Sequence, residues 1–338
     1  MSPWEATALG DCRMPKKYLV TGGTGFIGAA LVKRLVFDGH AVRVLDNNFR
    51  GALSKLGEVI NDLEFIEADI RDADTVIKSA RGMDSLIHLA FINGTEFFYS
   101  MPELVLDVGV RGMLSVIEAC RENGIGELVL ASSSEVYQTP LVVPTDETAP
   151  LSIPDVLNPR YSYAGGKIIS ELIAINYGRQ GFERVMIFRP HNVYGPDMGW
   201  EHVLPQFILR GVDLIKTNPA GAIKFPIKGD GSQTRAFVYI DDFIAGVVCI
   251  LDRGEHLNIY HIGNPEEITI RQAAERVIAC FGREAEIITG PAPEGETPRR
   301  CPDINKLRQL GFEPRVSFDA GIIPTAQWYA ENADKRKE

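Results

Sequence analysis

The chain of 338 residues has little of what marks secreted, metal-binding, membrane and nucleic-acid-binding proteins. Its five cysteines are scattered, odd in number and without a Cys-x-x-Cys pair, which argues against a disulfide framework and against a metal site of the zinc type. No run of about 18 apolar residues occurs, so we expect no membrane span. A formal charge of −10 argues against nucleic acid or an anionic membrane as the main partner.

The first 14 residues also lack the basic start and apolar centre of a secretory signal, and we expect a disordered or loosely attached extension there. With unpaired cysteines, this favours a reducing, cytoplasmic location. The length suggests about two domains, or one large domain with a lobe.

A strand, a glycine-rich turn and a helix follow this extension. Residues 16–21 form a short apolar strand pattern, which runs into Gly22 to Gly28 (GGTGFIG) and then into helical spacing over 29–36. Glycines let a pyrophosphate approach the backbone, and a helix N-terminus offers it N–H groups and a positive dipole end. A tight turn alone is the alternative, but the flanking strand and helix favour dinucleotide binding. The expected cofactor contacts are Gly22, Gly25, Phe26, Ile27 and Gly28.

A second strand pattern, residues 41–45, ends in Asp46 and Asn47. Asp46 lies at about the 20-residue distance at which a carboxylate accepts hydrogen bonds from the adenosine ribose. The same charge would repel a 2′-phosphate, which favours NAD over NADP. Arg43 and Arg50 are near in sequence, but neither occupies the strand tip.

Strand and helix patterns then alternate, which predicts an α/β fold with a Rossmann-type doubly wound parallel sheet covered on both faces. The patterns are strands at 63–68, 86–90, 128–131 and 185–189, and helices at 74–80, 104–120 and from 163. Ligands of such sheets lie beyond the carboxyl ends of the strands. These ends carry Asp69-Ile70, Leu89-Ala90 and the serine run 132–134 with Glu135. Asp69 is either an acceptor for the adenine amino group or a solvated loop acid.

Tyr163 and Lys167 are four residues apart, on one face of an expected helix. A nearby ammonium favours the phenolate and would bring the pKa of Tyr163 toward the working range. The plain alternative is an amphipathic helix with one aromatic residue and one lysine, since the spacing is common. Gly165 and Gly166 have no local explanation in a helix, and close approach of the backbone to the cofactor is one reason for them.

After a proline-rich loop (140–159) and the strand at 185–189, the alternation loosens into what we expect to be a smaller, interleaved C-terminal α/β substrate lobe. Helices are expected at 203–210, 241–251, 270–281 and 318–329, and a strand at 223–227. Arg235 follows a flexible turn, and arginine suits bidentate phosphate binding. Arg299 and Arg300 precede a Pro-Asp turn and are either a second phosphate contact or a solvated basic pair. We expect residues 15–190 plus about 236–262 to form the NAD-binding domain, and about 191–235 plus 263–338 to form this second lobe.

An ordered set of motifs between Tyr18 and about Phe312 resembles the extended short-chain dehydrogenases/reductases that act as nucleotide-sugar epimerases, dehydratases and decarboxylases. Any one motif is weak, but their order is specific. The motifs are Thr21 to Gly28, His88-Leu89-Ala90, Ser132 to Tyr137, Tyr163 with Lys167, Arg189 to Pro196, Gly229 to Arg235, and Arg300 to Asp303.

The resemblance implies a role for each matched residue. Tyr163 is the acid/base at a sugar hydroxyl while NAD takes hydride from the same carbon, usually C4. Lys167 holds the nicotinamide ribose and lowers the tyrosine pKa, and Ser133 hydrogen-bonds the reacting oxygen. Further residues are implied around the sugar and the diphosphate, and the family dimerises through the helices here at 104–120 and 163–177. These further residues are Ser134, Asn192, His202, Arg235 and Arg300, and Glu135 is expected to be catalytic together with Tyr163, Lys167 and Ser133.

Three departures from the family pattern bear on the reaction that follows oxidation. Ser134-Glu135 stands where 4,6-dehydratases carry Asp-Glu, which disfavours dehydration, and resembles the pair of UDP-glucuronate decarboxylases. Gln138 replaces the usual glycine. Residues 200–202 (Trp-Glu-His) serve either specificity or loop packing. We predict an NAD-dependent isomerase that epimerises C4 of a nucleotide hexose through a 4-keto intermediate. The alternatives are a UDP-uronic acid decarboxylase, a 4,6-dehydratase and a non-catalytic NAD-binding regulator.

Overall fold

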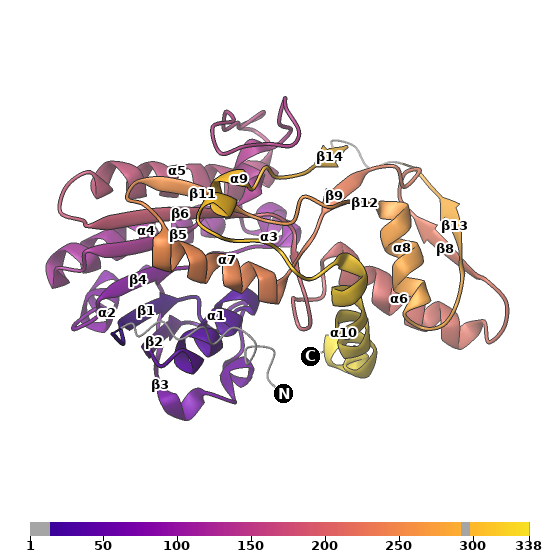
Figure 1. Cartoon of the computed structure of the whole chain (residues 1–338), viewed down its shortest axis with the longest axis horizontal. Helices are drawn as coiled ribbons and strands as arrows, with labels where there is room; N and C mark the ends of the chain where they lie inside the picture. Colours follow the sequence, from indigo (N-terminus) through magenta and orange to yellow (C-terminus); the bar gives the residue numbers. More distant parts are fainter. Residues whose placement is uncertain (1–13, 292–297, 338) are drawn as a thin grey trace. The chain divides into compact units, whose positions relative to one another are not determined.

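The computed structural model describes residues 14–291 and 298–337, which form two compact units (Figure 1). The first unit comprises the chain up to Gln138, Pro150–Pro190 and Ile244–Tyr260. The second comprises Thr139–Ala149, His191–Phe243 and the chain from His261 onward. The N-terminal extension that we expect covers residues 1–14, and residues 1–13 lie outside the described part of the chain.

The segment Thr139–Ala149 belongs to the second unit, whereas we expected it in the NAD-binding domain. Its backbone explains the difference. The Thr145 N–H donates to the Cys301 carbonyl (2.9 Å), and the Asp303 N–H donates to the Thr145 carbonyl (2.7 Å). These bonds attach the segment to chain that follows residue 261.

The first unit is built on a seven-stranded sheet with the order β11-β6-β5-β4-β1-β2-β3. The neighbours from β6 to β3 pair in parallel, and every residue of β4 and β5 is buried, as expected for a sheet covered on both faces. The strands are β1 (Lys17–Thr21), β2 (Ala41–Asp46), β3 (Leu63–Glu67), β4 (Ser85–His88), β5 (Glu127–Ala131), β6 (Arg184–Pro190) and β11 (Asn258–Ile262). The predicted Rossmann-type α/β fold is confirmed.

Helices flank this sheet, and α4 packs against both α2 and α5, while α7 crosses in front of the strands in Figure 1. The helices are α1 (Phe26–Phe37), α2 (Ala73–Ser79), α3 (Thr95–Ser100), α4 (Pro102–Asn123), α5 (Ser162–Gly178) and α7 (Ile240–Arg253). The longest, α4, begins with Pro102 in its first turn and ends before Gly124, whose φ of 64° suits glycine at a helix end. Its apolar face, with Val105, Met113 and Val116, joins the core of the unit. No helix of the described residues is long and apolar enough to span a membrane.

The second unit holds three small sheets and its own apolar core, which includes Phe225, Val277 and Phe318. The sheets have the orders β12-β9-β14, β13-β8 and β10-β7. The elements are β7 (Val193–Tyr194), β8 (Ile223–Ile227), β9 (Thr234–Ala236), β10 (Val238–Tyr239), β12 (Glu267–Thr269), β13 (Ala285–Thr289), β14 (Arg299–Arg300), α6 (Val203–Thr217), α8 (Ile270–Ala279), α9 (Asn305–Gln309) and α10 (Phe318–Glu331). Short 3-10 helices complete the described chain: η2 (Leu53–Leu56), η3 (Ile60–Asp62), η4 (Ser134–Tyr137), η5 (Pro159–Tyr161) and η6 (Ala333–Lys337).

Candidate active site

The glycine-rich turn leads from β1 into α1. Gly25 is the N-cap of α1, and no side chain caps the helix. A Cβ on Gly28 would lie 2.1 Å from the Gly22 carbonyl oxygen, whereas a Cβ on Gly25 would meet only that oxygen, at 3.4 Å. The turn is therefore closed at Gly28 and open at Gly25, next to the N–H groups of Phe26 and Ile27. This arrangement fits a pyrophosphate.

Asp46 ends β2 beside this turn and is buried. Its Oδ2 accepts the Thr24 N–H and its Oδ1 accepts the Asn48 N–H, each at 2.9 Å. The carboxylate is thus fixed against the glycine turn, where the adenosine ribose of a dinucleotide is expected. Arg43, in contrast, donates to Glu64 and to the carbonyls of Ser79 and Arg81, so it is engaged away from Asp46.

Asp69 follows β3 and is held by Arg71, a residue that the sequence analysis did not include. The guanidinium donates to both carboxylate oxygens, at 2.9 and 2.7 Å, and these hydrogen bonds lower the pKa of Asp69. Asn47 Nδ2 reaches the same carboxylate at 3.4 Å. Asp69 is therefore an ionised acceptor whose hydrogen-bonding capacity is shared with Arg71, and Ile70 beside it is buried in the core.

Leu89 and Ala90 follow β4 next to the glycine turn. The Leu89 N–H donates to the Thr21 carbonyl (3.0 Å) and the Ala90 N–H to Thr21 Oγ1 (3.4 Å). The Thr21 hydroxyl is also hydrogen-bonded to His88 Nδ1 at 2.8 Å. Burial lowers the pKa of His88 to about 3, so this imidazole is neutral at physiological pH.

Tyr163 lies in the first turn of α5, buried between two phenylalanine rings. Phe98 stacks on it at 4.9 Å, and Phe91 meets it edge-on at 5.2 Å. Burial raises the pKa of Tyr163, a hydrogen bond from Ser133 opposes the rise, and the charge of Glu135 adds to it. The expected lowering of the pKa by Lys167 is wrong for this structure, because burial of the phenol outweighs the interactions that favour the phenolate.

Lys167 lies one turn further along α5 and is also buried. Its ammonium donates to the Ala131 carbonyl at 2.7 Å, and lies 4.0 Å from the centre of the Phe91 ring and 5.8 Å from that of Tyr163. Burial lowers the pKa of Lys167 to about 7, against the charge of Glu171, which raises it. Lysine and tyrosine share one helix face as expected, but both are tuned mainly by desolvation.

A buried network that the sequence analysis missed surrounds this pair. Glu171, a turn beyond Lys167, accepts two hydrogen bonds from Arg189 of β6, at 2.9 and 2.6 Å, and one from the Ser132 hydroxyl. Arg189 also donates to the Tyr137 hydroxyl. The side chains of Glu171 and Arg189 are 5% and 2% exposed, so neither charge is solvated. The network ties the helix of Tyr163 to the strand end that precedes Ser133.

The residues after β5 form the short turn η4. Ser133 is its N-cap and accepts the Glu135 N–H at 3.2 Å, and Ser134 begins the turn. Gln138 ends it with a φ of 55°, a region that favours glycine, which is the residue the family usually has there. The Gln138 side chain donates to the Glu135 carbonyl at 2.6 Å. The turn thus keeps its backbone course without the glycine.

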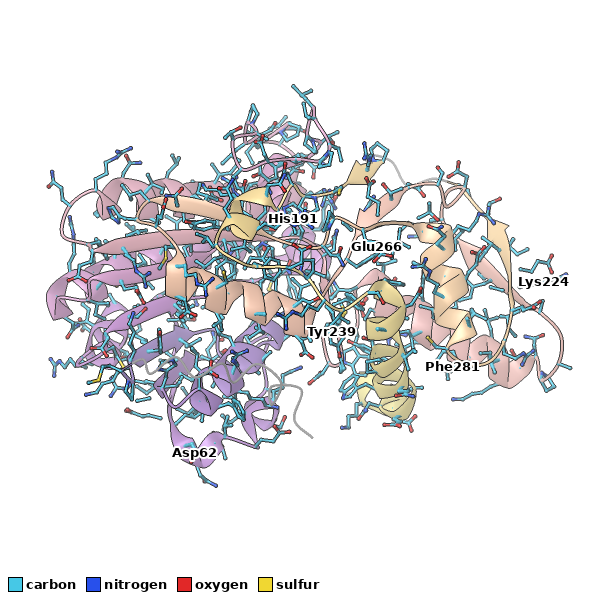
Figure 2. The ribbon with its side chains drawn as sticks, viewed as in Figure 1. Asp62, His191, Lys224, Tyr239, Glu266 and Phe281 are labelled. Atoms are coloured by element: carbon cyan, nitrogen blue, oxygen red, sulfur yellow. The ribbon has the colours of Figure 1, made fainter. Side chains whose placement is uncertain are left out.

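The remaining predicted residues lie in the second unit. Arg235 of β9 and Arg300 of β14 are register partners in a parallel pair, which places two guanidinium-bearing residues side by side. Asn192 donates to the Ala236 carbonyl at 2.9 Å. It follows His191, labelled in Figure 2, whose ring lies 4.6 Å from that of His261.

Trp200 packs in the second unit against two rings of α10, Trp328 at 5.7 Å and Tyr329 at 5.2 Å. The Tyr329 hydroxyl donates to the Gly199 carbonyl at 2.6 Å. Of the two interpretations of residues 200–202, specificity or loop packing, loop packing therefore accounts for Trp200. His202 is the N-cap of α6 through its backbone.

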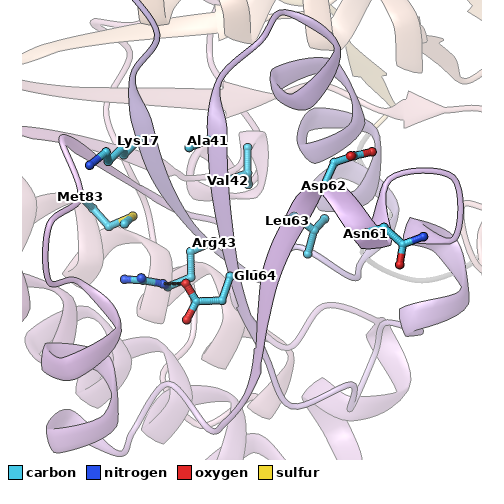
Figure 3. Close-up of a pocket in the computed structure, with 9 residues that line it drawn as sticks. All are labelled: Lys17, Ala41, Val42, Arg43, Asn61, Asp62, Leu63, Glu64 and Met83. Atoms are coloured by element: carbon cyan, nitrogen blue, oxygen red, sulfur yellow. Dashed lines mark hydrogen bonds and ion pairs between the residues drawn. The ribbon is translucent and has the colours of Figure 1, made fainter.

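A surface depression of about 470 Å³ lies at the amino ends of the strands, away from the glycine turn at their carboxyl ends (Figure 3). Lys17, Ala41 and Leu63, which line it, stand at the amino ends of β1, β2 and β3, and the paired side chains of Arg43 and Glu64 cross it. Ligands of doubly wound sheets bind beyond the carboxyl ends. We therefore assign no catalytic role to this depression.

The model of the NAD dependent epimerase/dehydratase family matches residues 18–263. The chain belongs to this family. The family that the sequence motifs predicted is thereby confirmed, and so is NAD as the cofactor of this family.

Named relatives cover nearly the whole chain. It is 31% identical to a UDP-N-acetyl-alpha-D-glucosaminuronate decarboxylase of Bacillus cytotoxicus over 94% of this chain and 99% of the relative. A dTDP-glucose 4,6-dehydratase from Streptomyces venezuelae, solved with NAD bound, is similar with a TM-score of 0.82, 30% identity and 94% and 98% coverage. A UDP-glucose 4-epimerase from Thermotoga maritima has a TM-score of 0.81, 25% identity and 94% and 99% coverage. The chain is an enzyme of this family, and its relatives carry out three different reactions.

The buried Glu171–Arg189 pair predicts a stability effect. Glu171→Gln leaves the Arg189 guanidinium buried without its carboxylate, and we expect a loss of about 3–5 kcal/mol in the free energy of unfolding. The double variant Glu171→Met, Arg189→Met removes both charges and should lose less than Glu171→Gln. Urea unfolding measures both.

The matched control is Glu313→Gln, which breaks the exposed pair with Arg308 and should cost at most about 1 kcal/mol. If Glu171→Gln costs no more than this control, Glu171 and Arg189 do not brace the unit.

Proposed function

We propose that this protein oxidises a hydroxyl carbon of a nucleotide-diphosphate sugar, with Tyr163 moving the hydroxyl proton. NAD, when bound, supplies the hydride acceptor. The observation that carries the proposal is the grouping of Tyr163, Lys167 and Ser133 in the unit that also holds the open glycine turn and Asp46. The glycine turn, Asp46 and Ser133 lie at or just beyond the carboxyl ends of strands, where such sheets bind ligands. Lys167 of α5 donates to Ala131, the last residue of β5.

The chemistry of this group follows from its burial. The phenol of Tyr163 is held protonated in the structure, so it is suited to donate a hydrogen bond to a sugar oxygen. To act as a base it must release its proton, and the hydrogen bond from Ser133 and the nearby ammonium of Lys167 both favour the phenolate. Tyr163 would take the hydroxyl proton as the carbonyl forms and return it when the carbonyl is reduced.

For the second half of the reaction we propose decarboxylation of a nucleotide-linked uronic acid. Oxidation at C4 turns the C6 carboxylate into a β-keto acid. The C5–C6 bond then breaks and carbon dioxide leaves. The electron pair of that bond passes into the C4 carbonyl, whose oxygen is stabilised by the Tyr163 proton. A proton then adds at C5, and C4 is reduced again, so NAD is regenerated.

Two observations support this choice over the epimerase that we expected from the sequence. Ser134-Glu135 resembles the corresponding pair of the decarboxylases. The match to the decarboxylase of Bacillus cytotoxicus covers 94% of this chain and 99% of that protein. A serine at 134 supplies no carboxyl proton for a departing C6 hydroxyl, which disfavours dehydration. C4 epimerisation stays the second candidate, favoured by the likeness to the Thermotoga epimerase and by needing no further acid.

For substrate binding we propose that Arg235, Arg300 and Asn192 hold the diphosphate, that Ser133, Ser134 and His202 contact the sugar, and that Glu135 takes part in proton transfer. Support comes from the pairing of Arg235 with Arg300 as register partners on neighbouring strands, because two arginines there are suited to bind a dianion.

We further propose a homodimer formed through α4 and α5. These helices expose several apolar side chains, among them Leu106 at 37%, Ile169 at 38% and Leu172 at 57%. Exposed apolar side chains gathered on neighbouring helices are typical of a protein interface.

Incubation with UDP-glucuronate should yield a product lighter by one carbon dioxide, read by mass spectrometry and NMR. UDP-glucose serves as the control substrate without a carboxylate. Tyr163→Phe should lower turnover by about 10²- to 10⁴-fold, because the proton carrier is lost. An isomer of unchanged mass from UDP-glucose, with no carbon dioxide from the uronate, would move the assignment to the epimerase, and turnover unaffected by Tyr163→Phe would refute the mechanism.

Arg300→Gln should raise the KM for the nucleotide sugar by roughly tenfold to a hundredfold, the worth of one or two charge-assisted hydrogen bonds. The neighbouring Arg299→Gln is the matched control, because Arg299 is bonded to Glu267 at 2.8 and 2.5 Å. Steady-state kinetics compare the two. Equal effects on KM would contradict a specific role for Arg300.

Leu172→Glu should convert the dimer into a monomer, since it would bury a charge in the proposed interface. Light scattering during size exclusion gives the mass. Ile288→Glu, on β13 of the second unit, is the control for an equally apolar exposed position. A wild-type protein with the mass of one chain would disprove the dimer.

A further inference from the structure

Phe91, three residues after β4, occupies a slot between two helices. A Cβ on Gly109 of α4 would lie 2.6 Å from Phe91 Cζ, and a Cβ on Gly166 of α5 would lie 2.9 Å from the same atom. Both distances are too short for any side chain. The close packing of the Phe91 ring therefore accounts for the glycine at 166, which the sequence left unexplained. Gly165 differs, because a Cβ there would meet only Ile153 Cδ1, at 3.8 Å.

The ring held in this slot faces the two residues proposed for catalysis. The Lys167 ammonium lies 4.0 Å from the ring centre, within the range of a cation–π contact. The ring of Tyr163 meets Phe91 at 5.2 Å and 84°, an edge-to-face pair. Phe91 thus contacts both the acid/base and the cation beside it.

A buried ammonium needs compensation, and its surroundings offer little. From β5, the Ala131 carbonyl accepts one hydrogen bond. On α5, Glu171 carries a negative charge but shares it with Arg189, and Tyr163 is neutral. From β4, His88 is neutral as well. The π face of Phe91, 4.0 Å from the ammonium, adds to the charge of Glu171 in favouring the charged form.

We propose that Phe91 is a positioning residue, set by Gly109 and Gly166, whose ring keeps the Lys167 ammonium charged and directed along the Tyr163 face of α5. The inference rests on the proposed function only for its effect on turnover. The state of Lys167 itself can be measured without a substrate.

The test is an NMR titration of the full-length protein labelled with ¹³Cε-lysine, with Lys167 assigned by the Lys167→Arg variant. Phe91→Leu keeps apolar bulk but removes the π face, and should lower the pKa of Lys167 by about one unit. Phe98→Leu is the matched control, because the Phe98 ring stacks on the Tyr163 ring with the centres 4.9 Å apart. This variant should leave the pKa of Lys167 unchanged.

Turnover gives the second readout. A lower folded pKa means that the charged fraction of Lys167 falls about tenfold at a pH above both pKa values, and is unchanged well below them. The Phe91→Leu variant should therefore lose activity relative to wild type mainly at alkaline pH. A uniform loss across pH would indicate a merely structural role.

Gly166→Ala tests the same contact if Phe91→Leu does not fold. Its methyl group should displace the ring and lower the pKa of Lys167, whereas Gly165→Ala should leave it unchanged. An unshifted Lys167 in Phe91→Leu or Gly166→Ala, or an equal shift in Phe98→Leu, overturns the proposal. A shifted Lys167 in a protein that turns over no nucleotide sugar would instead refute the proposed function and leave this inference standing.

Discussion

The structure of the first unit depends on three charges buried at one edge of its sheet. Lys167, Glu171 and Arg189 alternate in sign from α5 to β6, and each has a partner within the unit. A buried charge without a partner costs several kcal/mol, so the three side chains hold one another in place. Because Ser132 and Tyr137 also bond to this network, the turn that carries Ser133 and Glu135 is fixed relative to Tyr163.

This arrangement explains why the tyrosine and the lysine differ from a solvated pair. Desolvation favours the neutral form of both groups, which raises the pKa of Tyr163 and lowers that of Lys167. An acid/base needs a pKa that small changes in its surroundings can move across the working pH. The ring of Phe91 and the carboxylate of Glu171 act on the lysine, and Ser133 acts on the tyrosine. The glycine turn and Asp46, at the same edge of the sheet, fit the dinucleotide that family membership implies.

Much of the fold could be predicted from the sequence because apolar periodicity is local. The strand at 223–227 was predicted with its observed bounds, and the dinucleotide-binding turn followed from its context. The strand β11 was missed because Asn258 and His261 interrupt its apolar pattern and because it joins the sheet next to β6, far away in sequence. Glu171 and Arg189 were missed as partners because the pairing of a helix with a strand is a tertiary fact. The direction of the Tyr163 pKa was wrong for a related reason: spacing along a helix gives a distance to Lys167 but not the burial of either group.

We propose that the protein, with NAD bound at the carboxyl ends of the strands, reversibly oxidises a sugar. Rapid mixing of the NAD-loaded protein with UDP-glucuronate, followed by the absorbance of reduced nicotinamide, measures that step directly. The account predicts a transient rise and fall of the reduced cofactor within a turnover, and no rise in Tyr163→Phe. The proposed oxidation would be contradicted if product formed without any transient reduced nicotinamide, in a protein that does not exchange its cofactor, and if Tyr163→Phe left turnover unaffected.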